Sequence, residues 1–515
     1  MPETTATEAL SRRLPSTKLL LAVLVPALFL GLFAWSLASP IGSSPDDDFH
    51  QTNIWCAVDQ PGPECDPTSE RPAVLAAETG LARMVPARVG SYPCYKQNDQ
   101  SAACLDQVGT ELVPGRANAG TYPSGFYRVM HVFASDNAEA SVLAIRIFNA
   151  LIAVVLVGAA LLLTDGGLRR AVALTWLLGL APLAAFFLPS VNPSSWVIAG
   201  VGTFWAFLLR FLLNPSGWRG IASGCLAAVT AVMATIARPD GPAFLAVASL
   251  ACLVLAPTTR RDLVKRQYLL CYAVGVLALV FALTRESITN VLRHGVGAPD
   301  AAGGGSGLLL HNLGHVLQLG WLGLYGNSWG LGWGEAKMPL LLGILGTYLL
   351  VGALVVTWPS QRGRKIAVVA ALFVLVVGTP LYVLQRNNSQ VGGEVQPRYL
   401  LPLVLLFLAF LSLTLGRRYQ WRLPWWGVLP AALILTITNA VALHVLMDGY
   451  AFGHGLDSGF TGGAWWWSHG AMLPVWILGV LAMAVAYAAL AVTALSADQT
   501  SEVDRSTQPV ETTVA

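Results

Sequence analysis

Charged residues are scarce in this chain of 515 residues. Asp, Glu, Lys and Arg together make up 11% of it, against roughly a quarter in soluble domains. A water-soluble fold of this length would need far more charge to cover its surface, so the composition excludes a soluble globular protein. The formal net charge of +3 is too small to indicate nucleic-acid binding, and we expect no nucleic-acid partner.

Long apolar runs take the place of the missing charge, because 55% of the residues are hydrophobic. A helix needs about 20 apolar residues to cross a bilayer, and twelve segments of roughly this kind predict an all-α polytopic membrane protein with about 12 transmembrane helices. The sixth segment is short, so it and the fifth could form a kinked or partly inserted pair. The expected spans are 18–39, 141–164, 171–188, 194–213, 220–236, 242–256, 268–284, 339–358, 366–384, 399–415, 424–447 and 471–495.

The scarce basic residues predict the orientation. If the N-terminus is cytoplasmic, every short loop on that side carries at least two Lys or Arg residues, as the positive-inside rule requires. We therefore expect a cytoplasmic tail at 1–17, one transmembrane domain at 18–495 and a disordered cytoplasmic tail at 496–515. The long loops 40–140 and 285–338 would then lie outside the cytoplasm, facing the same side as the functional site.

Cysteine is also scarce, with seven residues in all. Four of them, Cys56, Cys65, Cys94 and Cys104, lie in the first outer loop, where cysteines commonly form disulfides. Four cysteines allow three connectivities, and the short separations favour Cys56–Cys65 and Cys94–Cys104. A zinc site is the competing interpretation, but the sequence contains no Cys-x-x-Cys spacing.

Three adjacent carboxylates, Asp46, Asp47 and Asp48, follow the first span, with His50 close behind. Because the three charges repel, we expect at least one raised pKa unless a cation compensates. One carboxylate could act as a general base toward an acceptor hydroxyl, or Asp46 and Asp47 could bind a divalent cation such as Mg²⁺ or Mn²⁺. A solvated acidic helix cap explains the cluster equally well.

Other polar residues recur at the outer ends of further spans. Ionisable groups near apolar helices are costly and are therefore functional candidates. Arg238 and Arg398 could clamp a phosphate through paired hydrogen bonds, and Arg146 is a third candidate. Taken singly, each arginine could instead be an interfacial anchor. The remaining candidates for substrate contact are Asp48, Tyr122, Asn192, Trp329, Trp333 and Tyr399.

Five short motifs stand in an order that resembles domain-of-unknown-function family 2142 of bacterial multi-spanning membrane proteins. They are Pro45-Asp46-Asp47-x-x-His50, Tyr122-Pro123, Ser190-Val191-Asn192-Pro193, Trp329 with Gly332-Trp333, and Gln396-Pro397-Arg398-Tyr399-Leu400-Leu401-Pro402. The resemblance runs from about Leu20 to Gly449. The chain departs from the family pattern at Asp47, Asp48, Ser194 and Pro397, where the family usually has Glu, Pro, Asp and Gly.

The resemblance implies a GT-C-like glycosyltransferase in the bacterial plasma membrane. Such an enzyme takes a sugar from a polyprenyl-phosphate donor and passes it to an envelope glycan or glycolipid acceptor at the extracytoplasmic face. Asp46 or Asp47 would then be the catalytic base, and His50 would orient the carboxylates or contact phosphate. Arg398, Arg238 and Arg146 would hold the donor phosphate.

Two other functions fit a membrane protein of this composition. A transporter or flippase of lipid-linked sugars usually needs ionisable residues near the bilayer midplane, and the predicted spans have few there. A non-catalytic envelope assembly protein would need no pocket beside Asp46. The clustering of charged residues at one face favours the transferase.

Overall fold

The structure of the protein is a computed structural model. It describes residues 15–57, 82–96, 100–118, 120–257, 259–284, 306–327, 329–334, 336–361, 363–392, 395–414, 423–453 and 463–497. Cys65 and most of the two expected tails lie outside these residues.

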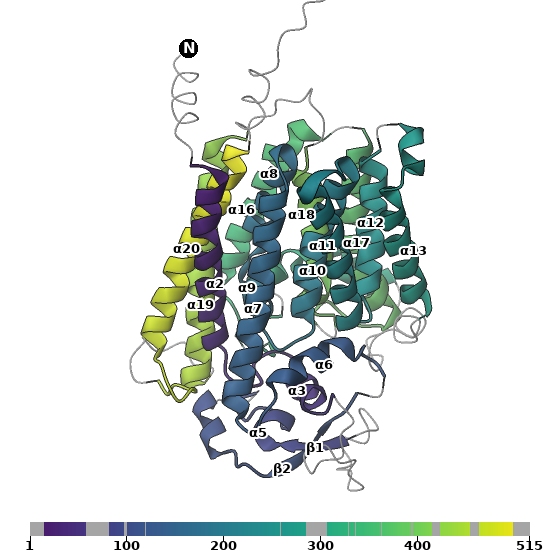
Figure 1. The fold of residues 1–515 in the computed structure, drawn as a ribbon. Coiled ribbons are helices and arrows are strands. Elements are labelled where there is room, and N and C mark those ends of the chain that lie inside the picture. Colours follow the sequence, from purple (N-terminus) through teal and green to yellow (C-terminus); the bar gives the residue numbers. More distant parts are fainter. Residues whose placement is uncertain are drawn as a thin grey trace, which may run out of the picture.

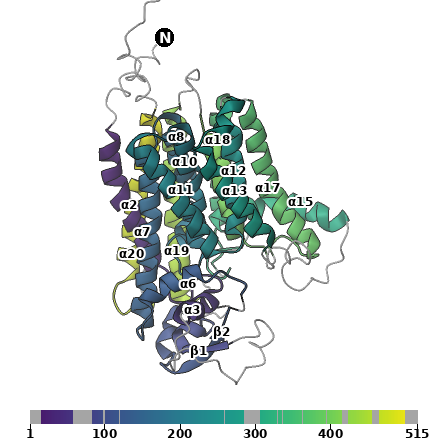
Figure 2. The same cartoon turned by 45° about the vertical axis from the view of Figure 1, so that its right-hand side comes forward.

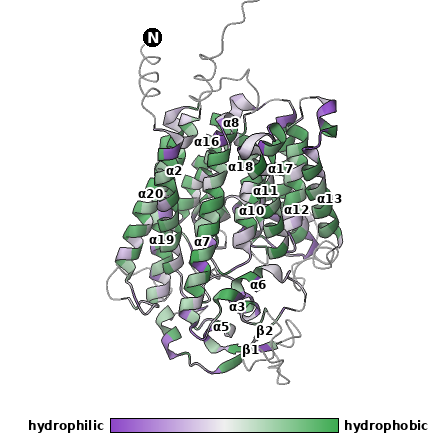
Figure 3. Cartoon of the chain, in the orientation of Figure 1, coloured by the Kyte–Doolittle hydropathy of each residue, from purple (hydrophilic) through white to green (hydrophobic). Residues whose placement is uncertain are grey.

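Apolar helices dominate the described residues. Eight of these helices are long and apolar enough to cross a membrane, and α12 (Gly241–Leu255), α13 (Tyr268–Thr284) and α18 (Pro397–Ser412) are apolar but shorter. Together they form one bundle of hydrophobic helices (Figures 1 and 3), which confirms the prediction of an all-α polytopic membrane protein. The eight longer helices are α2 (Thr17–Leu37), α7 (Ala138–Leu163), α10 (Ser194–Leu213), α11 (Gly217–Ala237), α16 (Leu340–Thr357), α17 (Arg364–Arg386), α19 (Trp425–Phe452) and α20 (Met472–Ser496).

The third expected span, 171–188, is wrong as a single helix. The chain forms α8 (Gly166–Gly179), breaks, and resumes as α9 (Pro182–Phe187). Pro182 has no N–H to donate to the preceding turn. The carbonyl of Leu180 at the break accepts hydrogen bonds from Asn439 Nδ2 at 3.2 Å and from the hydroxyl of Tyr487, so α19 and α20 satisfy the backbone group that the break exposes.

The described residues between 40 and 137 form a cap at one end of the bundle, the lower end in Figure 1, which we call the α3 end. The cap contains a two-stranded antiparallel sheet in which Ala82 pairs with Arg116 and Pro86 with Leu112. Its elements are α3 (Asp47–Trp55), β1 (Ala82–Pro86), α5 (Ala87–Gly90), η1 (Ala102–Gln107), β2 (Leu112–Arg116), α6 (Gly125–Met130) and η2 (His131–Phe133).

The segment between α13 and α16 includes a helix at the side of the bundle. This is α15 (Ser306–Gly320), which packs against α17 and projects outward in Figure 2. The short helix η4 (Leu322–Tyr325) follows it. Two further short helices, η3 (Arg260–Val264) and η5 (Trp358–Ser360), lie in other connections.

Two helices at the centre of the bundle lead to the candidate site. α10 and α18 are buried along nearly all of their length, and α10 packs against α7, α11, α12 and α18. The first residues of α10, α12 and α18 and the last residue of α11 all lie toward the α3 end. A polar residue at any of these helix ends therefore meets the cap rather than the apolar interior.

Candidate active site

Asp46 lies at the N-terminus of α3, in a turn that two distant residues hold in place. Its backbone φ of +66° is in the left-handed region, which Asp and Asn tolerate better than most side chains. The carbonyl of Pro45 accepts hydrogen bonds from Asn192 Nδ2 at 3.0 Å and from Arg398 Nη1 at 2.9 Å. These bonds bring the loop before α10 and the start of α18 to the same carboxylate.

The Asp46 carboxylate lies between two arginines. Its Oδ2 accepts a hydrogen bond from Arg398 Nη2 at 2.6 Å, and its Oδ1 is 3.6 Å from Arg116 Nη2. The side chain of Asp46 is 35% exposed, whereas that of Arg398 is 1% exposed. Burial raises the pKa of Asp46, but the positive charge of Arg398, helped by Arg116, outweighs it and lowers the pKa to about 2. Asp46 is therefore ionised and accessible.

The two neighbouring carboxylates have different surroundings. Asp47 is fully buried and accepts hydrogen bonds from the backbone N–H of Ser44 at 3.1 Å and from the Ser44 hydroxyl. Burial raises the pKa of Asp47 to about 6, although Arg146 and Ser44 oppose the shift. Asp48 receives two hydrogen bonds of 2.7 Å from Arg116. One of the three carboxyl groups thus has a raised pKa, as expected, but the main cause is burial of Asp47 rather than repulsion by its neighbours.

His50 lies on α3 and is buried in an aromatic cluster with Tyr122 and Tyr127. Its Nδ1 lies 2.9 Å from the hydroxyl of Tyr127, and its ring meets that of Tyr122 edge-on at 5.1 Å between centroids. The buried Nε2 has no hydrogen-bond partner among the described residues. Burial, together with Arg398 and Arg238, lowers the pKa of His50 well below its usual value despite the opposing charge of Asp46, so the imidazole is neutral at pH 7.

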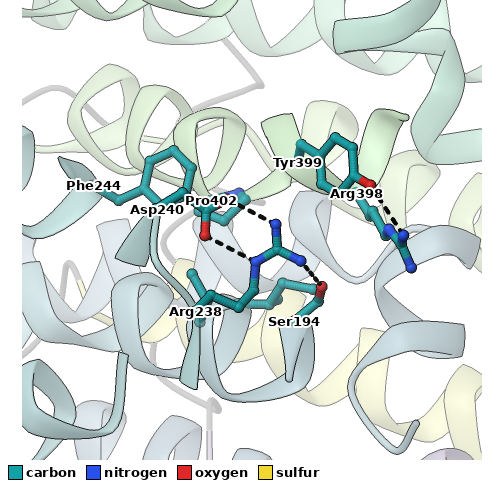
Figure 4. A pocket seen from close by; sticks show the side chains of 9 residues that line it. Ser194, Arg238, Asp240, Phe244, Arg398, Tyr399 and Pro402 are labelled. Carbon is teal, nitrogen blue, oxygen red and sulfur yellow. Dashed lines mark hydrogen bonds and ion pairs between the residues drawn. The ribbon is translucent and has the colours of Figure 1, made fainter. Parts of the chain in front are cut away.

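Arg238 lies at the end of α11 and already has a carboxylate partner. Its Nε and Nη2 each donate to Asp240 at 2.9 Å, and its Nη1 donates to Ser194 Oγ at 3.0 Å, as Figure 4 shows. Tyr399 connects this arginine to Arg398, because both guanidinium carbons lie close to its ring centroid, at 5.1 and 5.0 Å. Two arginines thus face one tyrosine at the α3 end.

A crevice too narrow to admit a water molecule lies beside these two arginines. We call it the arginine crevice (Figure 4). Its polar end comes from α11, α12 and α18, and apolar side chains of α10, α12 and α18 form the rest of its wall. The crevice therefore has two guanidinium groups, each paired with a carboxylate, at one end and apolar side chains along its length. It is lined by Ser194, Val197, Ile198, Arg238, Asp240, Phe244, Arg398, Tyr399 and Pro402.

Arg146 lies elsewhere, against the end of α2. It donates to the carbonyls of Ser36 at 3.1 Å and Pro40 at 2.8 Å, to the hydroxyl of Ser43 at 3.1 Å, and to the carbonyl of Ser39. It lines a second crevice that is also too narrow to admit a water molecule, and it is not among the residues of the arginine crevice. Its contacts fix the turn that leads from α2 to the acidic cluster.

The two candidate tryptophans lie in the turn after η4. Trp333 Nε1 donates to the carbonyl of Gly42 at 2.8 Å, and the Lys96 ammonium lies 3.6 Å from a Trp333 ring centroid. Trp333 thereby joins this turn to the start of the cap. Trp329 Nε1 is buried and has no hydrogen-bond partner among the described residues. Neither tryptophan is among the residues that line the arginine crevice.

One of the two expected disulfides is present in the cap. Cys94 and Cys104 are bonded, with their Cα atoms 6.2 Å apart, so this local pairing is confirmed. Cys56 is also disulfide-bonded, but Cys65 lies outside the described residues. The covalent link ties the segment after α5 to η1 and so braces the cap on which Arg116 is carried.

Arg116 is the site residue that sequence reasoning missed. It lies at the end of β2 and contacts both Asp48 and Asp46. The strand is five residues long, and no apolar alternation marks it in the sequence. Only the excess of arginines in a loop expected to lie outside the cytoplasm could have drawn attention to it.

The acidic cluster does not present its carboxylates as one set of ligands. Asp46 faces Arg398 and Arg116, whereas Asp47 faces Ser44. Among the described residues, no group of three or more His, Cys, Asp or Glu side chains converges in a way that could hold a metal ion. The divalent cation considered from the sequence stays a prediction.

A bundle of apolar helices with one polar site at its end defines a multi-pass membrane protein. Comparison with known families identifies it further: the family described as predicted membrane protein (DUF2142) matches residues 28–407. The chain belongs to that family, which confirms the resemblance inferred from the five motifs.

No curated protein matches the chain. Among solved structures, two of ArnT from Cupriavidus metallidurans are similar over most of the chain. The structure bound to undecaprenyl phosphate covers 93% of this chain and 78% of its own, with 12% identity and a TM-score of 0.38. The apo structure covers 95% and 78%, again with 12% identity and a TM-score of 0.38. A likeness of this size is too weak to assign a substrate.

Proposed function

We propose that the protein is a GT-C-type membrane glycosyltransferase. It moves a sugar from a polyprenyl-phosphate donor to a glycan or glycolipid acceptor of the bacterial cell envelope, at the extracytoplasmic face of the plasma membrane. The observation that carries the proposal is the arginine crevice, which joins two guanidinium groups to an apolar wall within reach of a partly exposed carboxylate.

The crevice has the chemistry that a lipid phosphate requires. Arginine presents a fork of N–H donors that matches phosphate oxygens, and Arg238 and Arg398 supply two such forks at one end. Val197, Ile198 and Phe244 supply an apolar wall that continues into the bundle, where an isoprenoid tail can leave water. A water-soluble nucleotide sugar has no apolar chain that could pack against this wall.

Asp46 is the carboxylate placed to act as the base, because it is partly exposed whereas Asp47 is fully buried. It takes the proton of an acceptor hydroxyl while the acceptor oxygen bonds to the anomeric carbon of the donor sugar. The bond from that carbon to the phosphate oxygen breaks, and its electron pair leaves with the lipid phosphate. Arg398 and Arg238 stabilise the negative charge of the leaving phosphate.

Donor binding makes Asp46 a better base. In the absence of donor, Arg398 holds the pKa of Asp46 at about 2, which is too low for efficient proton transfer at neutral pH. A phosphate that takes hydrogen bonds from Arg398 weakens that hold, and burial then acts to raise the pKa. Neutral His50 and Tyr127 support the turn behind Asp46. We assign Arg146 to positioning the same turn rather than to phosphate.

The basic residues at the other end of the bundle support the proposed orientation. Arg169, Arg170, Arg210 and Arg219 lie in or beside the connections opposite the α3 end, as expected for a cytoplasmic face. A fluorescent protein fused to the C-terminus should therefore fluoresce in the cytoplasm. An alkaline phosphatase fusion that is active at the same position would reverse the orientation.

The reaction is tested with the purified full-length protein in liposomes. A set of polyprenyl-phosphate sugars carrying different radiolabelled sugars is supplied with envelope glycans, and the matching nucleotide sugars serve as controls. We expect labelled glycan from a lipid-linked donor only, with release of polyprenyl phosphate. Movement of intact labelled donor across the bilayer without any transfer would instead show a flippase and overturn the proposal.

A further inference from the structure

Asp240 accepts hydrogen bonds from the two N–H groups of Arg238 that would bind a donor phosphate under the proposed function. Its two carboxylate oxygens each accept a hydrogen bond of 2.9 Å from Arg238. This two-point contact is the one that a guanidinium makes with two oxygens of a phosphate. A phosphate cannot take the same two N–H groups while Asp240 holds them.

The position of Asp240 in the fold does not require this contact. Asp240 is the N-cap of α12, where an aspartate usually accepts a hydrogen bond from the N–H groups of the first turn. No such bond forms here, and Pro242 at the second helical position has no N–H to give. The carboxylate is turned to Arg238 instead.

The turn between α11 and α12 keeps the two side chains together. Gly241 follows Asp240, and a Cβ atom at this glycine would lie 2.1 Å from the carbonyl oxygen of Ala234. The backbone of α11 and the start of α12 therefore touch, which sets Arg238 and Asp240 two residues apart across a tight bend. The side chain of Asp240 is 28% exposed against 8% for Arg238, so the aspartate has room to move and the arginine does not.

On the basis of the proposed function, we propose that Asp240 is a displaceable stand-in for the donor phosphate. It neutralises Arg238 in the empty site, leaves when a lipid phosphate enters, and competes for Arg238 again after the transfer. Its negative charge therefore weakens phosphate binding and promotes release of the lipid phosphate product. Asp240 therefore sets the affinity of the site for phosphate through Arg238.

The test measures binding rather than transfer. Farnesyl phosphate is titrated into the detergent-purified full-length protein, with farnesol and inorganic phosphate as separate probes. We expect Asp240→Asn, which keeps the size and a helix-capping side chain, to bind farnesyl phosphate about tenfold more tightly, since a hydrogen-bonded charge is the competitor that is lost. Farnesol affinity should not change.

Asp165→Asn is the matched control. Asp165 is also an N-cap aspartate without a capping bond, and it pairs with Arg219 at 3.9 Å at the opposite end of the bundle. This variant makes the same change of charge far from the crevice and should leave the Kd unchanged. In an Arg238→Gln background, Asp240→Asn should lose its gain, because the arginine for which the two anions compete is absent.

Three results would overturn the inference. Asp240→Asn that binds farnesyl phosphate as wild type does, or more weakly, with unchanged Tm would make Asp240 a purely structural partner of Arg238. An equal gain for inorganic phosphate would assign the site to free phosphate and not to a lipid. Wild-type protein and Asp240→Asn that both fail to bind farnesyl phosphate would refute the donor site itself, and with it the proposed function.

Discussion

Replacing Asp46 with Asn removes the negative charge of this side chain but keeps its shape and its backbone conformation. Asparagine has the same shape and also tolerates the left-handed backbone that Asp46 adopts at φ +66°. Its amide oxygen can still accept a hydrogen bond from Arg398. The substitution therefore removes the proton acceptor with little change to the turn.

The structure sets the size of the two expected effects. Loss of a general base lowers the rate by roughly 10²- to 10⁴-fold, which is about 3–5 kcal/mol in activation free energy. The effect on folding is smaller, about 1–2 kcal/mol, because the carboxylate is 35% exposed and the buried Arg398 keeps its bond to Pro45. Asp46→Ala should lose roughly a further 1 kcal/mol, since alanine does not tolerate the left-handed region.

The assay is transfer of labelled sugar from a polyprenyl-phosphate donor by the reconstituted protein, with Tm measured on the same preparations. We expect Asp46→Asn to lose at least a hundredfold in kcat with a small change in Tm, and to bind the donor more tightly, because the charge that competes for Arg398 is lost. An Asp46→Asn protein that folds and transfers sugar within tenfold of wild type would refute the assignment of Asp46 as the base.

The remaining predictions concern the surroundings of that carboxylate. The pKa of Asp47 is raised from 3.8 to about 6, so the stability that its protonated form contributes is complete below pH 4 and is lost as the pH rises through 6. The Tm of Asp47→Asn relative to wild type should therefore rise between pH 4 and pH 7. A Tm difference that does not change with pH would contradict the raised pKa. Arg398→Lys keeps the charge but loses the fork, so donor affinity, measured as Kd for a polyprenyl phosphate, should fall at least tenfold. Gly241→Ala places a methyl group against a backbone carbonyl and should lower the stability by about 1–3 kcal/mol, whereas Gly352→Ala, with open space around it, should not lower the Tm.

The helical fold could be predicted from the sequence because the bilayer imposes a length on every span. Each of the twelve apolar segments contains helix, and only the third departs from one helix per segment. Its break at Leu180 could not be foreseen from hydropathy, because the break depends on Asn439 and Tyr487, two side chains more than 250 residues away. The hydropathy of a segment indicates whether the segment lies in lipid or in water, but it does not indicate which side chains the segment contacts.

Parts of the site were predictable for a related reason. An arginine or a run of aspartates beside an apolar helix is costly unless something requires it, so Asp46, Arg238 and Arg398 attract attention one at a time. Their mutual contacts are tertiary. Nothing in the sequence distinguishes the exposed Asp46 from the buried Asp47 or links Arg116 to either, since these differences arise only when the cap folds onto the bundle.

The candidate site is balanced in charge, and under the proposed function this balance couples donor binding to activation of the base. A buried guanidinium without a counter-charge is strongly destabilising, and here Arg398 pairs with Asp46 while Arg238 pairs with Asp240. A donor phosphate that takes the paired N–H groups of both arginines replaces both carboxylates. Asp240 then moves away from Arg238, and Asp46, no longer bonded to Arg398, becomes more basic beside the acceptor. Under the proposed function, the contacts that stabilise the resting fold are therefore the ones that keep the base inactive until the donor is bound.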